Sequence, residues 1–378
     1  MKFNKWTVGL AAAGIVTLPS LTQAVDANMV QTAAASTTLS GYVDVAAQWN
    51  LGTGNGNNPA YTYGGMKKAD GFNLNVVDLA LDKPLDETPW AAGYHAELWF
   101  GPDAGTLATS GENAFAIRQA YVALRTPIGN GIDWKIGVFD TILGYESTSV
   151  GNNPNYTRSY SYTVQPTTHE GILGTYKLCD AATLTAGVAN TFGPMIGSRK
   201  PGSETDKVWM LGMTLTAPKS MGWLADSSMT VGYIDGFSSA TVNGNGNVSH
   251  LYTGLTLATP VTGLKAGFAL DYRHEHDAPN GFADTWVYGL YASYQATEKL
   301  SLHLRGEYVD DGAGVTSTDG NDKVRLFELT YTVQYDLWKN VLSRAEVRWD
   351  HASNRGQFGS NANLRNAVML AANVVYKF

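Results

Sequence analysis

The sequence predicts an all-β protein, a transmembrane antiparallel β-barrel of about sixteen strands with long extracellular loops and short periplasmic turns. Three observations support this fold class. The chain begins with an export-type leader, its segments alternate apolar and polar residues, and long and short connections follow one another in turn.

The N-terminus resembles a secretory signal. Two lysines precede an apolar stretch at 8–18, and a small-residue cleavage site ends at Ala24. We therefore predict that residues 1–24 form a signal peptide, and that residues 25–38, rich in Ala and Thr, form a short lead-in to the barrel. A retained membrane anchor is the alternative, but the apolar stretch is too short for a hydrocarbon layer of about 30 Å.

From residue 39 to residue 378 the chain contains segments with a period of two, each about as long as a tilted strand that crosses a membrane. The predicted strands lie at 39–51, 72–81, 91–100, 115–126, 132–139, 171–178, 182–192, 207–217, 227–237, 249–259, 264–274, 284–295, 300–309, 324–336, 341–351 and 366–378. We place the barrel in this part of the chain, 39–378.

The clearest strands have two chemically different faces. In 300–309, Leu302 and Leu304 alternate with His303 and Arg305. One row is expected to face lipid and the other water. A soluble β-sandwich also alternates in this way, so the pattern alone does not decide between the two folds.

The connections between the strands separate a membrane barrel from a soluble sandwich better than the strands do, because the connection lengths alternate. Long loops are expected at 52–71, 101–114, 140–170, 193–206, 238–248, 275–283, 310–323 and 352–365. The connections between them are mostly tight turns, with a medium one at 218–226. One rim therefore carries the long loops and the other the turns, as in outer-membrane barrels, and so wide a barrel leaves an aqueous lumen.

The last strand has an aromatic end. Alternate positions from Val368 to Tyr376 are apolar, and Phe378 is the C-terminal residue. A terminal strand of this kind resembles the closing strand of an outer-membrane barrel. We predict that Tyr376 and Phe378 form the signal by which the barrel-assembly machinery recognises the chain.

Charge and cysteine content argue against nucleic-acid binding and against a fold held by disulfides. Removal of the leader leaves 24 basic residues, which is 26 minus Lys2 and Lys5, against 33 acidic residues. This acidic balance argues against nucleic acid as a partner. Cys179 is the single cysteine, so no intramolecular disulfide can form. No cofactor motif is present, and Gly-x-Ser-x-Gly, the elbow of many hydrolases, is absent, so we expect no enzyme and no cofactor.

Histidines and acidic residues give weak indications of a metal. His274 and His276 could point to one side of a strand, but no third ligand has a recognisable spacing, so solvated rim residues are favoured. The acidic loop 310–323 could hold a divalent cation, although a solvated loop explains it as well. We therefore predict no metal site.

The longest loop, 140–170, is predicted to fold into the lumen and narrow it, since so long a connection usually has a task of its own. The alternative is an exposed loop that shields the surface. The residues expected at the constriction are Asp140, Glu146, Arg158, His169 and Glu170.

Charged residues in the polar rows are expected to line the lumen, because charge on the lipid face is costly. The principal candidates are Arg118, Lys135, Lys265, Asp271, Arg273, Arg305, Glu307, Arg344 and Arg348. Further candidates are Lys177, Asp44, Glu97, Asp133 and Asp350. Loop carboxylates opposite wall bases would set a transverse field that favours polar solutes. Ordinary solvation of the lumen wall is the alternative explanation for each residue.

The same loop carries the motifs by which the chain resembles a known family, the putative beta-barrel porin-2 (OmpL-like) outer-membrane proteins. The motifs are Gly137-Val138-Phe139-Asp140-Thr141, Gly144-Tyr145-Glu146, Asn153-Pro154-Asn155-Tyr156 and Arg158-Ser159-Tyr160, with Pro166, His169 and Gly171. The resemblance implies a porin-like barrel in the bacterial outer membrane, with a poorly defined substrate.

We therefore expect passive diffusion of small hydrophilic solutes and ions through a water-filled channel. The expected partners are these solutes, outer-membrane lipid and lipopolysaccharide, and further copies of the chain in a homotrimer, for which the sequence reveals no interface. The alternative is a plugged structural or adhesive barrel without transport. A solute such as a sugar could also bind the tyrosines of the loop, Tyr145, Tyr156, Tyr160 and Tyr162, unless these only hold the loop in place.

Overall fold

A computed structural model describes residues 36–59, 68–109, 114–239, 246–276, 284–318 and 323–378. The predicted signal peptide and most of the predicted lead-in therefore lie outside the described residues. Within the described part of the chain, no helix is both long and apolar enough to cross a membrane.

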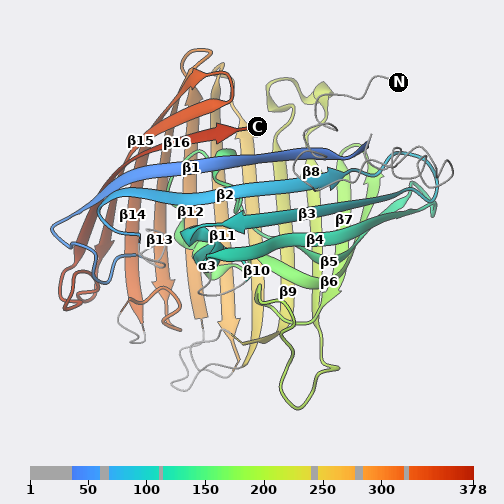
Figure 1. The fold of residues 1–378 in the computed structure, drawn as a ribbon, viewed down its shortest axis with the longest axis horizontal. Coiled ribbons are helices and arrows are strands. Elements are labelled where there is room, and N and C mark those ends of the chain that lie inside the picture. The colour runs from blue at the N-terminus through green and yellow to red at the C-terminus, as the bar shows by residue number, and fades with distance from the viewer. Residues whose placement is uncertain (1–35, 60–67, 110–113, 240–245, 277–283, 319–322) are drawn as a thin grey trace, which may run out of the picture.

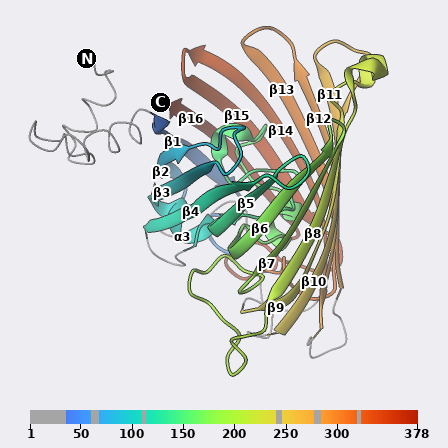
Figure 2. The same ribbon diagram turned by 90° about the vertical axis from the view of Figure 1, so that its right-hand side faces the viewer.

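The described residues form one closed antiparallel barrel, in which each strand pairs with the next and β16 pairs with β1 (Figures 1 and 2). The strands are β1 (Thr38–Leu51), β2 (Gly71–Lys83), β3 (Ala92–Phe100), β4 (Phe115–Thr126), β5 (Ile132–Asp140), β6 (Thr168–Cys179), β7 (Ala182–Ala189), β8 (Val208–Thr216), β9 (Ser228–Ser238), β10 (Gly246–Ala258), β11 (Leu264–Glu275), β12 (Asp284–Gln295), β13 (Leu300–Asp311), β14 (Val324–Trp338), β15 (Val341–Ala352) and β16 (Asn366–Lys377). The sixteen-stranded antiparallel barrel predicted from the sequence is confirmed.

Short helical segments lie in the connections. They are α3 (Pro102–Leu107), η3 (Val150–Asn152), α4 (Tyr160–Val164) and η4 (Lys219–Leu224). Three of them, α3, η3 and α4, belong to long loops that fold toward the barrel interior, and they bear on the site described below.

The C-terminus closes the barrel on its first strand. The backbone N–H of Gly41 donates to the Phe378 carbonyl at 3.1 Å, and that of Phe378 donates to the Gly41 carbonyl at 3.0 Å. A Cβ at position 41 would lie 2.9 Å from the Cζ atom of the Phe378 ring and 2.1 Å from the carbonyl oxygen of Asp78 on β2, so glycine allows both neighbours of β1 to approach here. The last residue is thus part of the closure.

The two rows of each strand separate as predicted. On β13 the side chain of Leu304 is 45% exposed on the outside, whereas its neighbour Arg305 is fully buried on the inside. Exposed aromatic side chains gather near both ends of the strands, as in the belts where a bilayer meets water. Near the long loops these are Trp49, Phe72, Phe115, Trp209, Phe327 and Trp349, and near the turns Tyr294, Tyr335, Trp338 and Tyr376.

At the end of the barrel that carries the long loops, the inward rows differ from the polar rows expected from the sequence. There several inward side chains are apolar and fully buried, although a water-filled lumen predicts polar ones. Examples are Val248, Val287, Val309 and Val324. The physical reason is that loops fold inward and pack on these positions, so the wall needs an apolar surface at this level.

Candidate functional site: loop 141–167 and the wall that holds it

The loop between β5 and β6 runs inside the barrel (Figure 2). Its two ends lie side by side, because Asp140 pairs with Thr168 and the backbone N–H of Thr141 donates to the Thr167 carbonyl at 3.1 Å. Most of its residues are buried, and Arg158 is among the most deeply buried side chains of the protein. In the structure the connection between β5 and β6 spans 141–167, where 140–170 was expected.

The first part of the loop packs against β8–β12 on an apolar surface that contains glycines. Leu143 lies over Gly232, where a Cβ would come within 2.5 Å of its Cδ2 atom. Tyr145 lies over Gly267, where a Cβ would come within 2.0 Å of its hydroxyl, and its ring stacks on Tyr291 at 4.0 Å between centroids. We call Gly232, Gly267 and Tyr291 the apolar seat.

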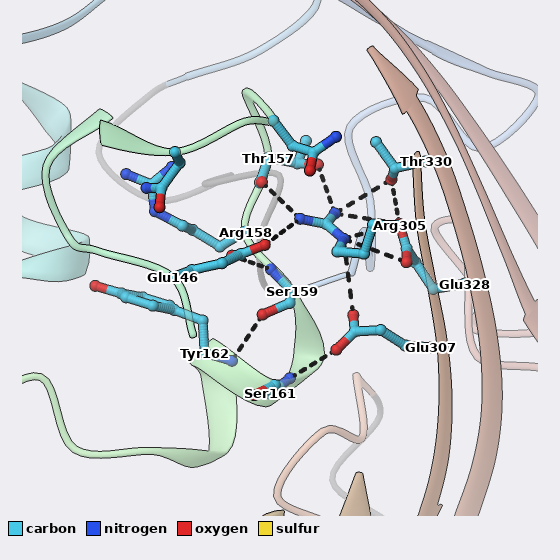
Figure 3. Close-up of polar contacts among 12 residues, drawn as sticks. Glu146, Thr157, Arg158, Ser159, Ser161, Tyr162, Arg305, Glu307, Glu328 and Thr330 are labelled. Atoms are coloured by element: carbon cyan, nitrogen blue, oxygen red, sulfur yellow. Dashed lines mark hydrogen bonds and ion pairs between the residues drawn. The ribbon is translucent and has the colours of Figure 1, made fainter. Parts of the chain in front are cut away.

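The middle of the loop meets charged side chains of β13–β15, which we call the charged clamp: Arg305, Glu307, Glu328, Arg344, Glu346 and Arg348. Arg305 lies at its centre (Figure 3). Its Nη1 donates to Glu146 Oε1 at 2.7 Å and to the Thr157 carbonyl at 2.9 Å, and its Nη2 donates to Glu328 at 3.1 Å. One wall arginine thereby joins a loop carboxylate, the loop backbone and a wall carboxylate.

The carboxylates of the clamp accept from the loop backbone. Glu346 accepts from the N–H groups of Tyr156 at 2.6 Å and Thr157 at 3.0 Å. At the start of α4, Glu307 accepts from the N–H groups of Tyr160 at 2.7 Å and Ser161 at 3.0 Å. Figure 3 shows the bond from Ser161. Charge-assisted bonds of this kind are among the stronger hydrogen bonds in proteins. These two wall residues thus hold main-chain groups of the loop.

The arginines of the clamp complement this pattern, because they donate to loop carbonyls. Arg344 Nη2 donates to the Asn153 carbonyl at 2.5 Å, and Arg348 Nη1 donates to the Arg158 carbonyl at 2.5 Å. On β15, the arginines therefore donate to carbonyl groups of the loop, and Glu346 between them accepts from N–H groups of the loop. The clamp binds the loop mainly by its backbone.

Two predicted constriction residues, Glu146 and Arg158, hold the loop together from within. Glu146 Oε2 accepts from the Ser159 N–H at 2.8 Å, in addition to its ion pair with Arg305. Arg158 Nη2 donates to the Thr148 carbonyl at 2.6 Å, and its guanidinium lies 5.7 Å from the centroid of the Tyr162 ring. Both side chains are buried in this conformation.

The end of the loop is held by β11. Asp271 accepts from Ser161 Oγ and from Gln165 Nε2, both at 2.6 Å, and lies 2.8 Å from the Nε2 atom of His250. Arg273 Nη1 donates to the Val164 carbonyl at 3.1 Å. The structure thus brings predicted wall residues of β11, β13 and β15 together around one loop.

A second loop also folds inward, which the sequence analysis did not predict. Leu107 of α3 packs in one apolar cluster with Val150 and Tyr162 of loop 141–167. Beside them, Lys68 forms a buried ion pair with Asp103 at 2.7 Å. The available indication in the sequence was the presence of apolar residues in this loop, Ala104, Leu107 and Ala108, because a fully solvated loop gains nothing from them.

The other predicted constriction residues lie elsewhere. Asp140 ends β5, pairs with Arg118, and keeps 44% of its side chain exposed. His169 belongs to β6 and is buried in its inward row, with Nε2 at 3.1 Å from Thr141 Oγ1. Glu170 falls in the same row as the exposed residue Ile172, which faces outward.

The constriction role predicted for Glu170 is therefore wrong. Its carboxylate accepts from the Gly197 N–H at 2.7 Å and pairs with Arg199 at 3.4 Å, in the loop between β7 and β8. The physical reason is that β6 begins at Thr168, so the ladder, with its period of two, fixes the direction of this side chain. The sequence analysis started the strand three residues later.

The remaining wall candidates lie in the inward rows but away from the clamp. Lys135 Nζ lies 4.7 Å from the centroid of the Tyr121 ring, and Lys265 is exposed at the turn end of β11. Other predicted wall residues take part in polar contacts within the wall. Lys177 pairs with Asp180, Asp133 with Arg125, and Arg348 with Asp350; Asp44 accepts from Asn75 and Asn373, and Glu97 from Gln119.

Sequence reasoning missed Glu328 and Glu346 as site residues. Both lie in the polar rows of predicted strands, so the alternation indicated their inward direction. It could not indicate that a loop distant in sequence would bring backbone N–H groups to Glu346.

The weak metal indications do not form a site. The described residues contain no group of three or more His, Cys, Asp and Glu side chains arranged to hold a metal ion. His274 lies 2.8 Å from Asp284, and His276 lies 2.7 Å from Ser249 Oγ. Part of the acidic loop 310–323 lies outside the described residues.

Comparison with known proteins identifies the class. The barrel resembles solved outer-membrane proteins along almost its whole length. OmpT of Vibrio cholerae, described as a trimer form, is 14% identical, with 90% of this chain and 99% of that chain covered and a TM-score of 0.59. DcaP, an outer membrane channel of Acinetobacter baumannii, is 13% identical, with coverages of 90% and 97% and a TM-score of 0.57. At such identities the likeness is one of fold.

An anion-selective porin from Comamonas acidovorans gives a similar result, with 13% identity, coverages of 91% and 99%, and a TM-score of 0.58. No curated protein sequence matches the chain. The protein is an outer-membrane channel of the porin class, located in the bacterial outer membrane. It belongs to the family described as "Putative beta-barrel porin-2, OmpL-like", which matches residues 36–378, as the motifs of the inward loop predicted. This membership indicates a channel.

Proposed function

We propose that the channel passes small hydrophilic solutes and ions by passive diffusion, and that loop 141–167 forms its narrowest level. The observation that carries this proposal is the position of the loop, which lies inside the barrel and is bound to the inward rows of β11, β13 and β15. A loop held across a wide lumen reduces the area open to a solute.

The charges of this level would select polar solutes. Loop and wall carry charges of opposite sign in contact, with Glu146 of the loop paired with Arg305 of the wall, and Arg348 of the wall donates to the neutral Arg158 carbonyl beside them. Where such groups meet water, they set a field across the passage that favours solutes able to orient in it and disfavours apolar ones. No cofactor and no covalent step take part.

Single-channel conductance of the refolded mature protein in a planar bilayer tests this proposal. A salt gradient across the bilayer makes the reversal potential report ion preference in the same recording. Steady openings support diffusion through the barrel. A folded, heat-modifiable barrel without conductance would instead support the plugged structural or adhesive barrel, and would direct the search to the outer loops.

We also propose a homotrimer, on the precedent of the OmpT structure described as a trimer form. Outer-membrane lipid and lipopolysaccharide would contact the exposed outward rows and the aromatic belts. Light scattering of the protein in mild detergent tests the assembly, and a monomer mass under all gentle conditions would contradict it.

The proposed role of the C-terminal strand as an assembly signal rests on its exposed end. Tyr376 is 50% exposed in the outward row, and Phe378 bonds to the first strand. Deletion of Phe378 should reduce the amount of folded barrel in the membrane. The variant Val374→Ala, which changes the same outward row and keeps the aromatic end, is the matched control. Equal assembly of the two variants would contradict the proposal.

A further inference from the structure

We infer that loop 141–167 is a gate, closed in the conformation described above, which opens when the loop leaves the charged clamp on β13–β15. This inference rests on the proposed function, because it concerns how diffusion begins. It adds that the buried charges of the wall meet the permeating solute only after the loop has moved.

The closed state follows from the burial of the loop on several sides. Val150 and Tyr162 pack with Tyr42 of β1 and Leu107 of α3. Leu143 packs in a second apolar cluster. Its wall members include Leu173, Met210, Ile234 and Tyr252. Buried side chains therefore pack on the loop from β1, α3 and β6 to β10. In the inferred closed state a hydrated solute passes only when the loop is displaced.

A third cluster closes the loop from the outer rim. Tyr160 and Val164 pack with Phe358 of the loop between β15 and β16, and Phe358 is fully buried. The wall supplies Val309 and Val324 to the same cluster. Phe358 thus packs on the α4 end of the loop, and in the inferred gate it acts as a latch on that end.

The clamp is the side that can release, because its contacts are polar. Water can solvate each group that separates, and the attraction within a buried ion pair roughly balances its loss of hydration. At the apolar seat no gain of hydration offsets separation, because exposure of the apolar surfaces of Leu143 and Tyr145 to water costs free energy. The loop is therefore expected to stay attached at the seat while its middle moves.

Opening would give the charged clamp a second role. Once the loop backbone leaves, Arg344, Glu346 and Arg348 line a wet passage with alternating sign along β15. Arg344 and Arg348 were predicted from the sequence to line the lumen. In the closed state Arg344, Glu346 and Arg348 bind carbonyl and amide groups of the loop.

A disulfide between loop and wall tests the gate. Asn155 Nδ2 donates to Thr332 Oγ1 of β14 at 2.7 Å, so Asn155→Cys with Thr332→Cys ties the loop to the clamp side. Cys179→Ser is the background, because Cys179 is exposed. Thr214→Cys with Thr230→Cys is the matched control, since these hydroxyls lie 3.1 Å apart within the wall. Mass spectrometry verifies that each disulfide has formed.

The expected result is that the oxidised loop–wall protein loses most openings in a planar bilayer and regains them with a reductant, whereas the control conducts equally in both states. Conductance of the oxidised loop–wall protein equal to that of its reduced form would overturn the gate and leave the proposed diffusion intact. Absence of conductance in the reduced and control proteins would overturn the proposed function, and the gate with it.

A second variant keeps the inference testable if the engineered cysteines do not pair. Phe358→Ala removes the latch without touching the clamp or the seat. Open probability should rise several-fold, with the size of the single openings unchanged. The matched control is Leu364→Ala in the same outer loop, whose side chain is exposed. Equal open probability in both variants and the parent would count against the gate.

Discussion

The two sides of the barrel hold the same loop by opposite means. At the apolar seat the wall has glycines, which carry no side chains. Leu143 and Tyr145 of the loop fill the space above them. At the charged clamp the wall contributes long charged side chains, and the loop contributes mainly its backbone. The comparison shows that wall residues determine the fit at the clamp, whereas residues of both partners determine it at the seat.

This difference has an energetic consequence. A buried ion pair adds little net stability, but loss of one partner leaves an uncompensated charge, which costs about 3–5 kcal/mol. A glycine that gains a methyl group against a movable side chain costs less, because the neighbour can shift. Substitutions at the charged clamp should therefore lower the stability of the folded barrel more than substitutions at the apolar seat.

The largest effect is expected for Arg305→Ala. Glu146 and Glu328 lose their shared guanidinium, so the folded barrel should lose about 3–5 kcal/mol. The folded fraction along a urea series, read from heat-modifiable mobility, measures this loss. The control Arg325→Ala breaks an ion pair with Asp310 that is nearly half exposed, and should cost no more than about 1 kcal/mol. Equal costs at the two positions would contradict the role of Arg305.

A smaller effect is expected for Glu346→Gln, which keeps the shape of the side chain and removes its charge. Hydrogen bonds from two loop N–H groups weaken, with a loss of about 1.5–3 kcal/mol. The same urea series provides the measurement. Thr157→Val in the loop removes a hydroxyl that donates to Glu346 and accepts from Arg305 and Arg348, but it leaves both backbone bonds to Glu346 in place. If the clamp acts mainly on the backbone, this variant should cost less than the wall substitution. A greater loss of stability in the loop variant would mean that loop side chains, and not the loop backbone, determine the fit at the clamp.

At the seat, Gly267→Ala should cost about 1–2 kcal/mol, because the new methyl group meets the hydroxyl end of Tyr145, which can shift. Gly193→Ala is the matched control, since a Cβ there has no neighbour within 4 Å. In Gly267→Ala the displaced Tyr145 should also become accessible to nitration by tetranitromethane. Unchanged stability and unchanged nitration together would show that the loop does not rest on this glycine.

The smallest effect is expected for Asn155→Ala. The loop loses one side-chain bond to Thr332, worth about 0.5–1.5 kcal/mol, while the backbone contacts of the clamp remain. The urea series should thus place this variant between the parent and Glu346→Gln. A loss as large as that of Arg305→Ala would mean that loop side chains, and not the backbone, hold the clamp side.

The sequence predicted the barrel well because each strand repeats a local pattern. The alternation in 300–309 or 341–351 identifies the outward row without knowledge of any partner, since lipid imposes one requirement on all strands. Strand bounds were accurate to within a few residues for the same reason. The error at β6 was small in sequence but large in effect, because it reversed the direction predicted for Glu170.

The inward face was less predictable, because it depends on contacts between distant segments. Val309 and Arg305 lie in the same row of β13, yet one packs on an outer-rim cluster and the other holds loop 141–167. Nothing within 300–309 separates these roles. The inward fold of α3 escaped prediction for the same reason, since its apolar residues meet partners from loop 141–167.

Replacement of the loop by a tight turn tests the central claim most directly. Because Asp140 pairs with Thr168, residues 142–166 can be exchanged for Asn-Gly, a two-residue turn suited to an antiparallel hairpin. The account predicts single-channel conductance several-fold above that of the parent, with steady openings and weaker size selection. A folded variant with the conductance of the parent would contradict the claim that loop 141–167 is the narrowest part of the channel.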